Sequence, residues 1–432
     1  MNRSTVVRLV AVLAVVLALG RATFAQEIVA NPSTPLGVYT LGQPIAWQVE
    51  VRGEGAAQIS ELHFVLKKNG LVAVREGVLP MVGGKATLEA TLGEPGTLLA
   101  EFKMTVGGKE FSALAGAAVD PTALAPTLPR PADFDAFWNA KLAEMRNTPA
   151  HPVLTPADPG KAQVDYYKIQ MNGYRGSHIY GQFAKPKGEG KHPALLIVQW
   201  AGVYGLSPSW AIDYAELGWL TLNIMPHELP FDQPEEFYKH ASETTLSSYT
   251  AIGNDDRETS YFLRMYLSCY QAAEYLAHRP DWDGRVLVVM GSSQGGMQSI
   301  VTAALEPRIT AALANVPAGC DLNGPVVNRA PGWPGWWWRT DGKDARKVRE
   351  AARYFDVVNF ASRVTCPAQV ALGLIDTTCP APGEFVMTNQ LRGPKEVIVM
   401  PNVGHGSSDY SQGRSRVWLE ALAKGQAPPM PQ

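Results

Sequence analysis

The sequence predicts an α/β protein, in which a mostly parallel sheet covered by helices on both faces follows a small all-β domain. From residue 164 onward, unbroken apolar runs alternate with helical patterns, which is typical of a parallel sheet buried on both faces. Between residues 26 and 119 the apolar runs are short and alternating. The length of 432 residues exceeds what one ordinary core needs, so two domains are expected.

The first 25 residues have the pattern of a cleavable secretory signal. Arg3 and Arg8 supply positive charge, residues 9–19 form an apolar core, and residues 23–25 provide the cleavage positions. The core is too short for an ordinary transmembrane helix, and no cysteine follows the cut to carry a lipid. We therefore expect a mature chain that begins near Gln26 and is secreted or periplasmic, without a membrane anchor.

Residues 26–119 are predicted to form an immunoglobulin-like β-sandwich. Alternating runs such as 46–51, 61–66, 86–90 and 99–104 are separated by glycine and proline. No catalytic combination of serine, histidine and carboxylate occurs there, so we expect a structural or binding role. A proline-rich linker at residues 120–131 follows.

Residues 132–428 are predicted to form the α/β domain. It opens with an amphipathic helix at 132–145, whose aromatic stripe we assign to core packing. The strands expected after it cover residues 166–171, 177–184, 194–198, 219–225, 286–290, 309–316, 368–375 and 396–400, with a helix at 260–276. Ligands bind such sheets at the carboxyl ends of the strands.

The motif Gly-Ser-Ser-Gln-Gly at residues 291–295 lies between an apolar strand and a helix. This context is typical of the nucleophile elbow of the α/β-hydrolase fold, with Ser293 as the nucleophile. The flanking glycines avoid clashes with the neighbouring strand and helix. The alternative is a glycine-rich turn without chemistry.

The α/β-hydrolase triad follows the chain order serine, acid, histidine. Of eight histidines, only His405 follows Ser293, and it lies directly after the strand at 396–400. Asp376 directly ends the strand at 368–375 and is the predicted acid, with Asp321 as second candidate. The N–H groups of Gln294 and Val203, or Gly202 in place of Val203, are predicted to form the oxyanion hole.

Composition argues against several other classes of function. A net charge of −2 gives no electrostatic basis for binding nucleic acid or an anionic membrane. Four cysteines are too few for a disulfide scaffold, and no CxxC or Cys/His cluster predicts a metal site. Cys366 and Cys379 flank one strand and could pair, but we expect free, buried thiols. No cofactor is required by the predicted chemistry.

A proline- and glycine-rich loop at residues 331–339 contains four tryptophans. Indole faces stack well on sugar rings, so Trp333, Trp336 and Trp337 are candidates for substrate contact. The alternative is that they pack on the domain below or on another copy of the chain, which would make a homo-oligomer.

Several stretches resemble the acetylxylan esterase/cephalosporin C deacetylase family (carbohydrate esterase family 7). They comprise residues 291–296, 305–309, 315–317, 320–321, 354–361, 373–376, 379–380 and 393–396. The resemblance covers roughly residues 130–425 and implies that the acid and histidine fall on Asp376 and His405. It further implies a serine esterase of the α/β-hydrolase superfamily that removes acetyl or other small acyl groups from a carbohydrate.

The sequence departs from the family pattern at three places, and all three line or brace the predicted pocket. Pro226-His227-Glu228 stands where the family has Arg-Gly-Gln, Ala201-Gly202-Val203 replaces His-Gly-Tyr, and His405-Gly406 replaces His-Glu. His227 is therefore expected at the pocket floor, where it either contacts a substrate hydroxyl or braces the oxyanion loop.

Two other functions remain open from sequence. A prolyl oligopeptidase-like peptidase also joins an N-terminal β domain to this fold, but about 95 residues without repeats are too few for a propeller. A catalytically weak carbohydrate-binding protein would use the sandwich and the tryptophan loop instead. Reactivity of Ser293 distinguishes the latter from an esterase.

Overall fold

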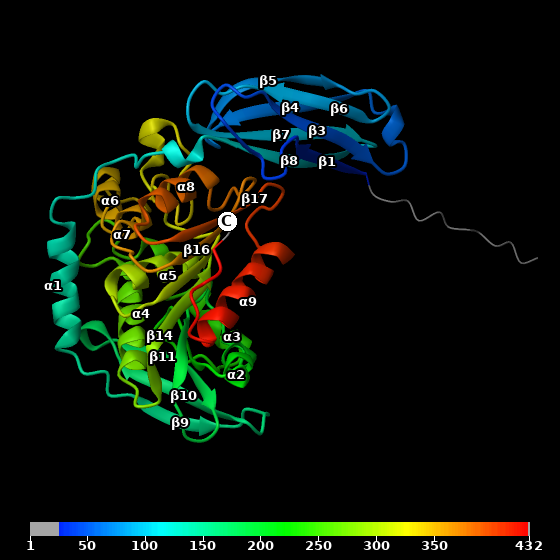
Figure 1. Ribbon diagram of the computed structural model, residues 1–432. Helices are drawn as coiled ribbons and strands as arrows, with labels where there is room; N and C mark the ends of the chain where they lie inside the picture. Colours follow the sequence, from blue (N-terminus) through cyan, green and yellow to red (C-terminus); the bar gives the residue numbers. More distant parts are fainter. Residues whose placement is uncertain (1–25, 431–432) are drawn as a thin grey trace, which may run out of the picture.

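The structure is a computed structural model that describes residues 26–430. The predicted signal at residues 1–25 lies outside the described residues. No helix between residues 26 and 430 is long and apolar enough to cross a membrane. The chain forms an N-terminal β-sandwich that packs on a larger α/β domain (Figure 1).

Within the described residues the sandwich consists of a three-stranded and a five-stranded sheet, with strand orders β1-β3-β6 and β2-β8-β7-β4-β5. The strands are β1 (Glu27–Pro32), β2 (Val38–Tyr39), β3 (Ile45–Arg52), β4 (Glu61–Lys68), β5 (Val72–Pro80), β6 (Lys85–Ala90), β7 (Gly96–Val106) and β8 (Lys109–Val119). Every second residue of β3 is buried from Ile45 to Val51, so the predicted alternation does mark the face toward the sandwich core.

The α/β domain contains a nine-stranded sheet, counted over residues 26–430, with the order β17-β16-β15-β14-β12-β13-β11-β10-β9. These strands are β9 (Val153–Ala157), β10 (Val164–Asn172), β11 (His178–Pro186), β12 (His192–Ile197), β13 (Leu220–Ile224), β14 (Trp282–Ser292), β15 (Ala311–Asn315), β16 (Ala368–Gly373) and β17 (Lys395–Met400). Strands β12 to β17 pair in parallel, and β9 to β11 join antiparallel at one side. The predicted α/β-hydrolase fold is confirmed.

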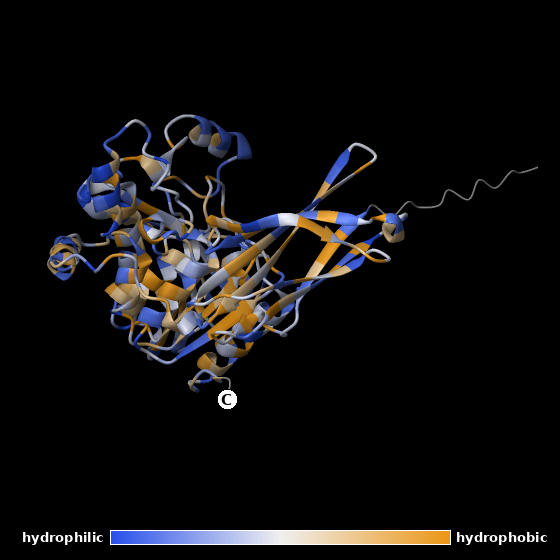
Figure 2. Ribbon diagram, turned by 90° about the horizontal axis from the view of Figure 1, so that it is seen from above, coloured by the Kyte–Doolittle hydropathy of each residue, from blue (hydrophilic) through white to orange (hydrophobic). Residues whose placement is uncertain are grey.

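Helices cover both faces of this sheet because its strands are apolar on both sides. In β12, Leu196 packs with one helical layer while Leu195 and Ile197 pack with the other. Figure 2 shows the hydrophobic colour concentrated along the strands. The helices are α1 (Phe134–Arg146), α2 (Ser209–Glu216), α3 (Glu235–Glu243), α4 (Tyr261–Ala277), α5 (Gln294–Leu305), α6 (Ala345–Ala352), α7 (Val357–Ala361), α8 (Ala381–Gln390) and α9 (Asp409–Ala423).

The sandwich contacts the α/β domain at the carboxyl ends of β16 and β17. Gly116 of β8 lies so close to Leu374 that a Cβ at position 116 would be 2.5 Å from the Leu374 Cβ and carbonyl oxygen. Asn402 Nδ2 donates a hydrogen bond of 2.7 Å to Asn31 Oδ1 of β1. The two sandwich contacts therefore fall on the loops that carry the predicted acid and histidine.

Candidate active site

Ser293 lies at a tight turn between β14 and α5, as the elbow motif predicts. Its backbone has φ 58° and ψ −119°, a conformation that L residues rarely adopt. Gly295 is required beside it, because a Cβ there would be 2.5 Å from the carbonyl oxygen of Val198. The sheet and the helix thus hold the serine hydroxyl above the carboxyl end of β14.

Ser293, His405 and Asp376 form a continuous hydrogen-bonded chain. His405 Nε2 lies 2.8 Å from Ser293 Oγ, and His405 Nδ1 lies 2.7 Å from Asp376 Oδ2. The other carboxylate oxygen accepts from the backbone N–H groups of Thr378 and Cys379, at 2.7 and 2.8 Å. Asp376 is buried, whereas the His405 side chain is 28% exposed. This order of contacts can move a proton from the serine to the imidazole.

Asp321, the second candidate for the acid, has a different set of partners. It accepts hydrogen bonds from the N–H and hydroxyl of Thr127, at 3.0 and 2.7 Å, and pairs with Arg329. Thr127 belongs to the segment between the domains, so Asp321 anchors that linker to the α/β domain. The structure brings Asp376, and not Asp321, to His405.

The predicted oxyanion loop follows β12 and is held from below by a buried polar network. His227 Nε2 donates to the carbonyl oxygen of Gly202 at 2.9 Å, and Nδ1 accepts from the Tyr261 hydroxyl at 2.7 Å. The Tyr249 hydroxyl donates to Gln294 Oε1 at 2.7 Å and accepts a longer bond of 3.4 Å from the Gly202 N–H. His227 and Tyr249 therefore connect the loop to the residue after Ser293.

The chemistry of this network depends on a neutral histidine. His227 is 2% exposed, and burial lowers its pKa to about 4. A neutral imidazole has one donor and one acceptor nitrogen, which matches its two partners. Gln294 is the first residue of α5, so its N–H has no intrahelical acceptor and is free to face an oxyanion.

The tryptophan loop divides into buried and exposed members. Trp336 is 1% exposed and donates to the carbonyl oxygen of Thr250, so it offers no face to a ligand. The Arg349 guanidinium lies 3.7 Å from the Trp337 ring centroid and covers it. Trp333 is half-buried and stacks on Phe262. Its backbone N–H donates to the carbonyl oxygen of Thr378. Thr378 belongs to the loop after β16 that carries Asp376, here called the acid loop, so Trp333 lies beside the candidate site.

Metal binding competes poorly with the observed contacts. In the part of the chain that the structure describes, one group, Asp376, Cys379 and His405, has ligand atoms within 4.8 Å of one another. His405 Nδ1 already bonds Asp376 Oδ2 and His405 Nε2 already bonds Ser293 Oγ, so both ring nitrogens are in use. All four cysteines lie within residues 26–430 and are free; Cys269, Cys320 and Cys379 are buried as expected, whereas Cys366 is half-buried.

Sequence reasoning missed the residues that hold the site together. Tyr249 and Tyr261 were not singled out because isolated tyrosines carry no local pattern. Glu384 in α8 was also missed: it is fully buried, and burial together with the charge of Asp376 raises its pKa well above the usual range. An acidic residue among the apolar residues of the first two turns of α8 was the available signal.

The nucleophile elbow, the hydrogen-bonded Ser-His-Asp chain and the sheet order together define an α/β-hydrolase. Comparisons with known proteins give the family: the acetyl xylan esterase (AXE1) model matches residues 123–422. The chain belongs to the acetyl xylan esterase family and is a carboxylic ester hydrolase.

Relatives agree with this placement. The chain is 32% identical to acetyl esterase Axe7A of Xylanibacter ruminicola over 392 residues, covering 90% of this chain and 88% of the relative. Solved acetyl xylan esterases from Paenibacillus sp. R4 and Thermoanaerobacterium sp. JW/SL YS485 are each 25% identical, with TM-scores of 0.60 and 0.62. Both comparisons cover 70% of this chain, and 98% and 97% of those structures respectively.

Proposed function

We propose that this protein is an exported serine esterase that removes acetyl or other small acyl groups from a carbohydrate, through an acyl-enzyme. The observation that carries the proposal is the hydrogen-bonded chain from Ser293 through His405 to Asp376, at an elbow, in a member of the acetyl xylan esterase family. Export is supported by the signal pattern of residues 1–25.

The first half of the reaction forms the acyl-enzyme. Ser293 Oγ attacks the ester carbonyl carbon while His405 Nε2 takes the hydroxyl proton. The N–H groups of Gln294 and Val203 stabilise the oxyanion, and Asp376 stabilises the imidazolium. The bond between the carbonyl carbon and the sugar oxygen then breaks, and His405 returns the proton to that oxygen.

The second half releases the acid. A water molecule takes the place of the sugar, gives a proton to His405 Nε2 and attacks the acyl carbon. The bond to Ser293 Oγ breaks, the serine recovers its proton, and the carboxylic acid leaves. Side chains of this protein supply each proton transfer.

A carbohydrate substrate is supported by the names of the relatives and by Trp333. This half-buried indole lies beside the acid loop, where a sugar ring held for attack by Ser293 would extend. Trp336 is enclosed and Trp337 is covered by Arg349, so we retain only Trp333 as a sugar contact.

The first prediction is that Ser293→Ala loses activity by about 10⁴-fold or more while keeping its melting temperature. Turnover is measured on acetylated xylo-oligosaccharides, on 4-nitrophenyl acetate and on an acyl-peptide. In a separate experiment the wild-type protein is labelled with a fluorophosphonate, and mass spectrometry identifies the labelled residue. Labelling at a residue other than Ser293 would refute the nucleophile. Preference for the acyl-peptide would show a peptidase instead.

A further inference from the structure

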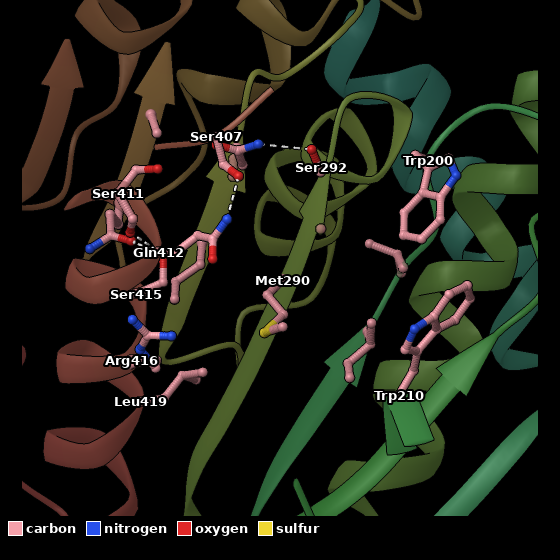
Figure 3. Close-up of a pocket in the computed structure, with 18 of the residues that line it drawn as sticks. Trp200, Trp210, Met290, Ser292, Ser407, Ser411, Gln412, Ser415, Arg416 and Leu419 are labelled. Carbon is pink, nitrogen blue, oxygen red and sulfur yellow. Dashed lines mark hydrogen bonds between the residues drawn. The ribbon is translucent and has the colours of Figure 1, made fainter. Parts of the chain in front are cut away.

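A cavity lies behind the nucleophile elbow, between α2 and α9 (Figure 3). Its volume of about 450 Å³ is in the range of small-molecule sites. Its walls come from α2 on one side and α9 on the other, and strand ends of the sheet form its floor. Ser292 lies at its upper end, while Ser293 is not among its lining residues.

The floor and one wall of this cavity are apolar. Met290, Leu313 and Ala371 contribute to the floor, and Trp200 and Trp210 form the wall beside α2. The two indole rings meet at 63° with their centroids 5.0 Å apart, and Trp200 is 43% exposed. A flat apolar ring is the shape that such a corner accommodates.

The polar residues of the opposite wall mostly bond one another. Gln412 Nε2 donates to Ser407 Oγ at 2.7 Å, and Ser415 Oγ donates to Gln369 Oε1 at 2.7 Å. Asn315 Nδ2 donates to Ser292 Oγ at 2.9 Å and to the carbonyl oxygen of Gly406 at 3.1 Å. A sugar in this cavity would therefore leave hydroxyls against apolar side chains without partners, which is costly.

Arg416 is the exception in that wall. It is the one charged residue among the lining side chains, and it is exposed; no side chain or carbonyl between residues 26 and 430 pairs with its guanidinium, which therefore faces solvent. A guanidinium matches a carboxylate with two parallel hydrogen bonds. An anionic group on a ligand in this cavity could therefore pair with Arg416 without breaking a contact within the protein.

We propose that the cavity between α2 and α9 binds an aromatic monocarboxylate, with its ring against Trp200 and Trp210 and its carboxylate on Arg416. The occupant would also lie beside Ser292 and Asn315, next to the nucleophile. The proposal is independent of which ester Ser293 hydrolyses, but its test rests on the reactive Ser293 of the proposed function; mass spectrometry of the labelled protein reports a failure of that function separately.

The test uses protein whose Ser293 has been blocked with a fluorophosphonate, so that binding in the catalytic site is excluded. Cinnamate is titrated calorimetrically and is expected to bind at one site. Arg416→Gln should weaken cinnamate binding by about fivefold or more, and Trp210→Leu should weaken it as well. Arg346→Gln, which changes an exposed arginine outside the cavity, is the matched control and should bind like the wild type.

Two further probes separate the sources of affinity. Cinnamamide, which keeps the ring without the charge, should bind the wild type as weakly as cinnamate binds Arg416→Gln. Xylobiose should bind more weakly than cinnamate. Equal cinnamate affinity in Arg416→Gln and wild type, no heat of binding, or tighter binding of xylobiose would each overturn the proposal.

Discussion

The two sides of the candidate active site are held in place by different means. On the oxyanion side, His227 and Tyr249 support Gly202 and Gln294 from within the α/β domain. On the acid–histidine side, the loops after β16 and β17 rest on the sandwich through Leu374 and Asn402. The contacts on the first side therefore come from within one domain, whereas the second side also contacts a domain outside the matched family region.

The sandwich lies against the loop that carries Asp376. The family model begins at residue 123, after the sandwich. In this chain the backbone of β8 takes a place against the acid loop, and only glycine fits at that contact. The sandwich thus contacts one half of the candidate site, and we expect it to support that half.

The largest expected effect separates the two buried aspartates. Asp376→Asn keeps the shape of the loop but favours the wrong histidine tautomer, so kcat should fall by roughly 10²–10⁴-fold. Asp321→Asn replaces one carboxylate oxygen and removes the negative charge that pairs with Arg329, so it should lower the melting temperature while leaving kcat close to wild type. The reverse pattern in steady-state kinetics would assign the acid to Asp321.

The second effect tests the oxyanion side. His227→Ala removes the donor to Gly202 and the acceptor of Tyr261, so the loop loses its support. We expect kcat to fall about 10²-fold for both a sugar ester and 4-nitrophenyl acetate, because a 1 Å misplacement costs that much. A rise in KM for the sugar ester alone would mean that His227 contacts substrate.

The same variant has a pH signature. The pKa of His227 is lowered from 6.5 to about 4 in the folded protein. Above pH 6.5 the imidazole is neutral in both the folded and the unfolded protein. As the pH falls from 6.5 toward 4 the unfolded chain takes up the proton first, so the folded protein loses stability. Wild type should therefore lose more melting temperature than His227→Ala between pH 7 and about 4.5. His240→Ala, at an exposed histidine of α3, is the control.

A third substitution tests the sandwich side. Gly116→Ala places a methyl group 2.5 Å from the Leu374 carbonyl oxygen, so β8 and the acid loop must separate. We expect about tenfold lower kcat and about 1–3 kcal/mol lower stability. Gly93→Ala is the matched control, since its Cβ meets nothing within 4 Å. Equal kinetics for the two variants would show that the sandwich does not position the acid.

The smallest effect concerns Glu384, whose two carboxyl oxygens have no hydrogen-bond partner among residues 26–430. The pKa of Glu384 is higher in the folded protein than in the unfolded chain, where it is near 4.5. Below pH 4.5 the carboxyl group is protonated in both the folded and the unfolded protein. As the pH rises above 4.5 the unfolded chain loses this proton more readily, so the free energy of unfolding falls. Glu384→Gln should therefore melt about 2–4 °C higher than wild type at pH 8. The difference should vanish near pH 4, and thermal melts at both pH values decide it.

Local sequence patterns predicted much of this molecule. The elbow needs only a strand, five residues and a helix, and the chain order of the triad then leaves His405 as the single histidine available. Asp376 followed from its place at the end of an apolar strand. The fold followed from the same alternation of strands and helices.

The remainder depends on contacts between distant segments. Nothing near Tyr249 indicates that its hydroxyl meets Gln294, and nothing near Gly116 indicates that Leu374 lies against it. The prolines and glycines around Trp336 left substrate contact and packing on the domain below both open, and the ring packs beside Phe262 in the core. Packing partners of this kind are fixed by the tertiary structure and leave no periodic signal.

The contact between Gly116 and Leu374 also leads to an expectation about folding, because it joins the two domains. The two residues lie in opposite halves of the chain, and domains generally fold as units with the N-terminal one first. The sandwich can thus fold first, and the acid loop can pack on it once the α/β domain has folded. We therefore expect that, when the full chain refolds, turnover recovers later than secondary structure.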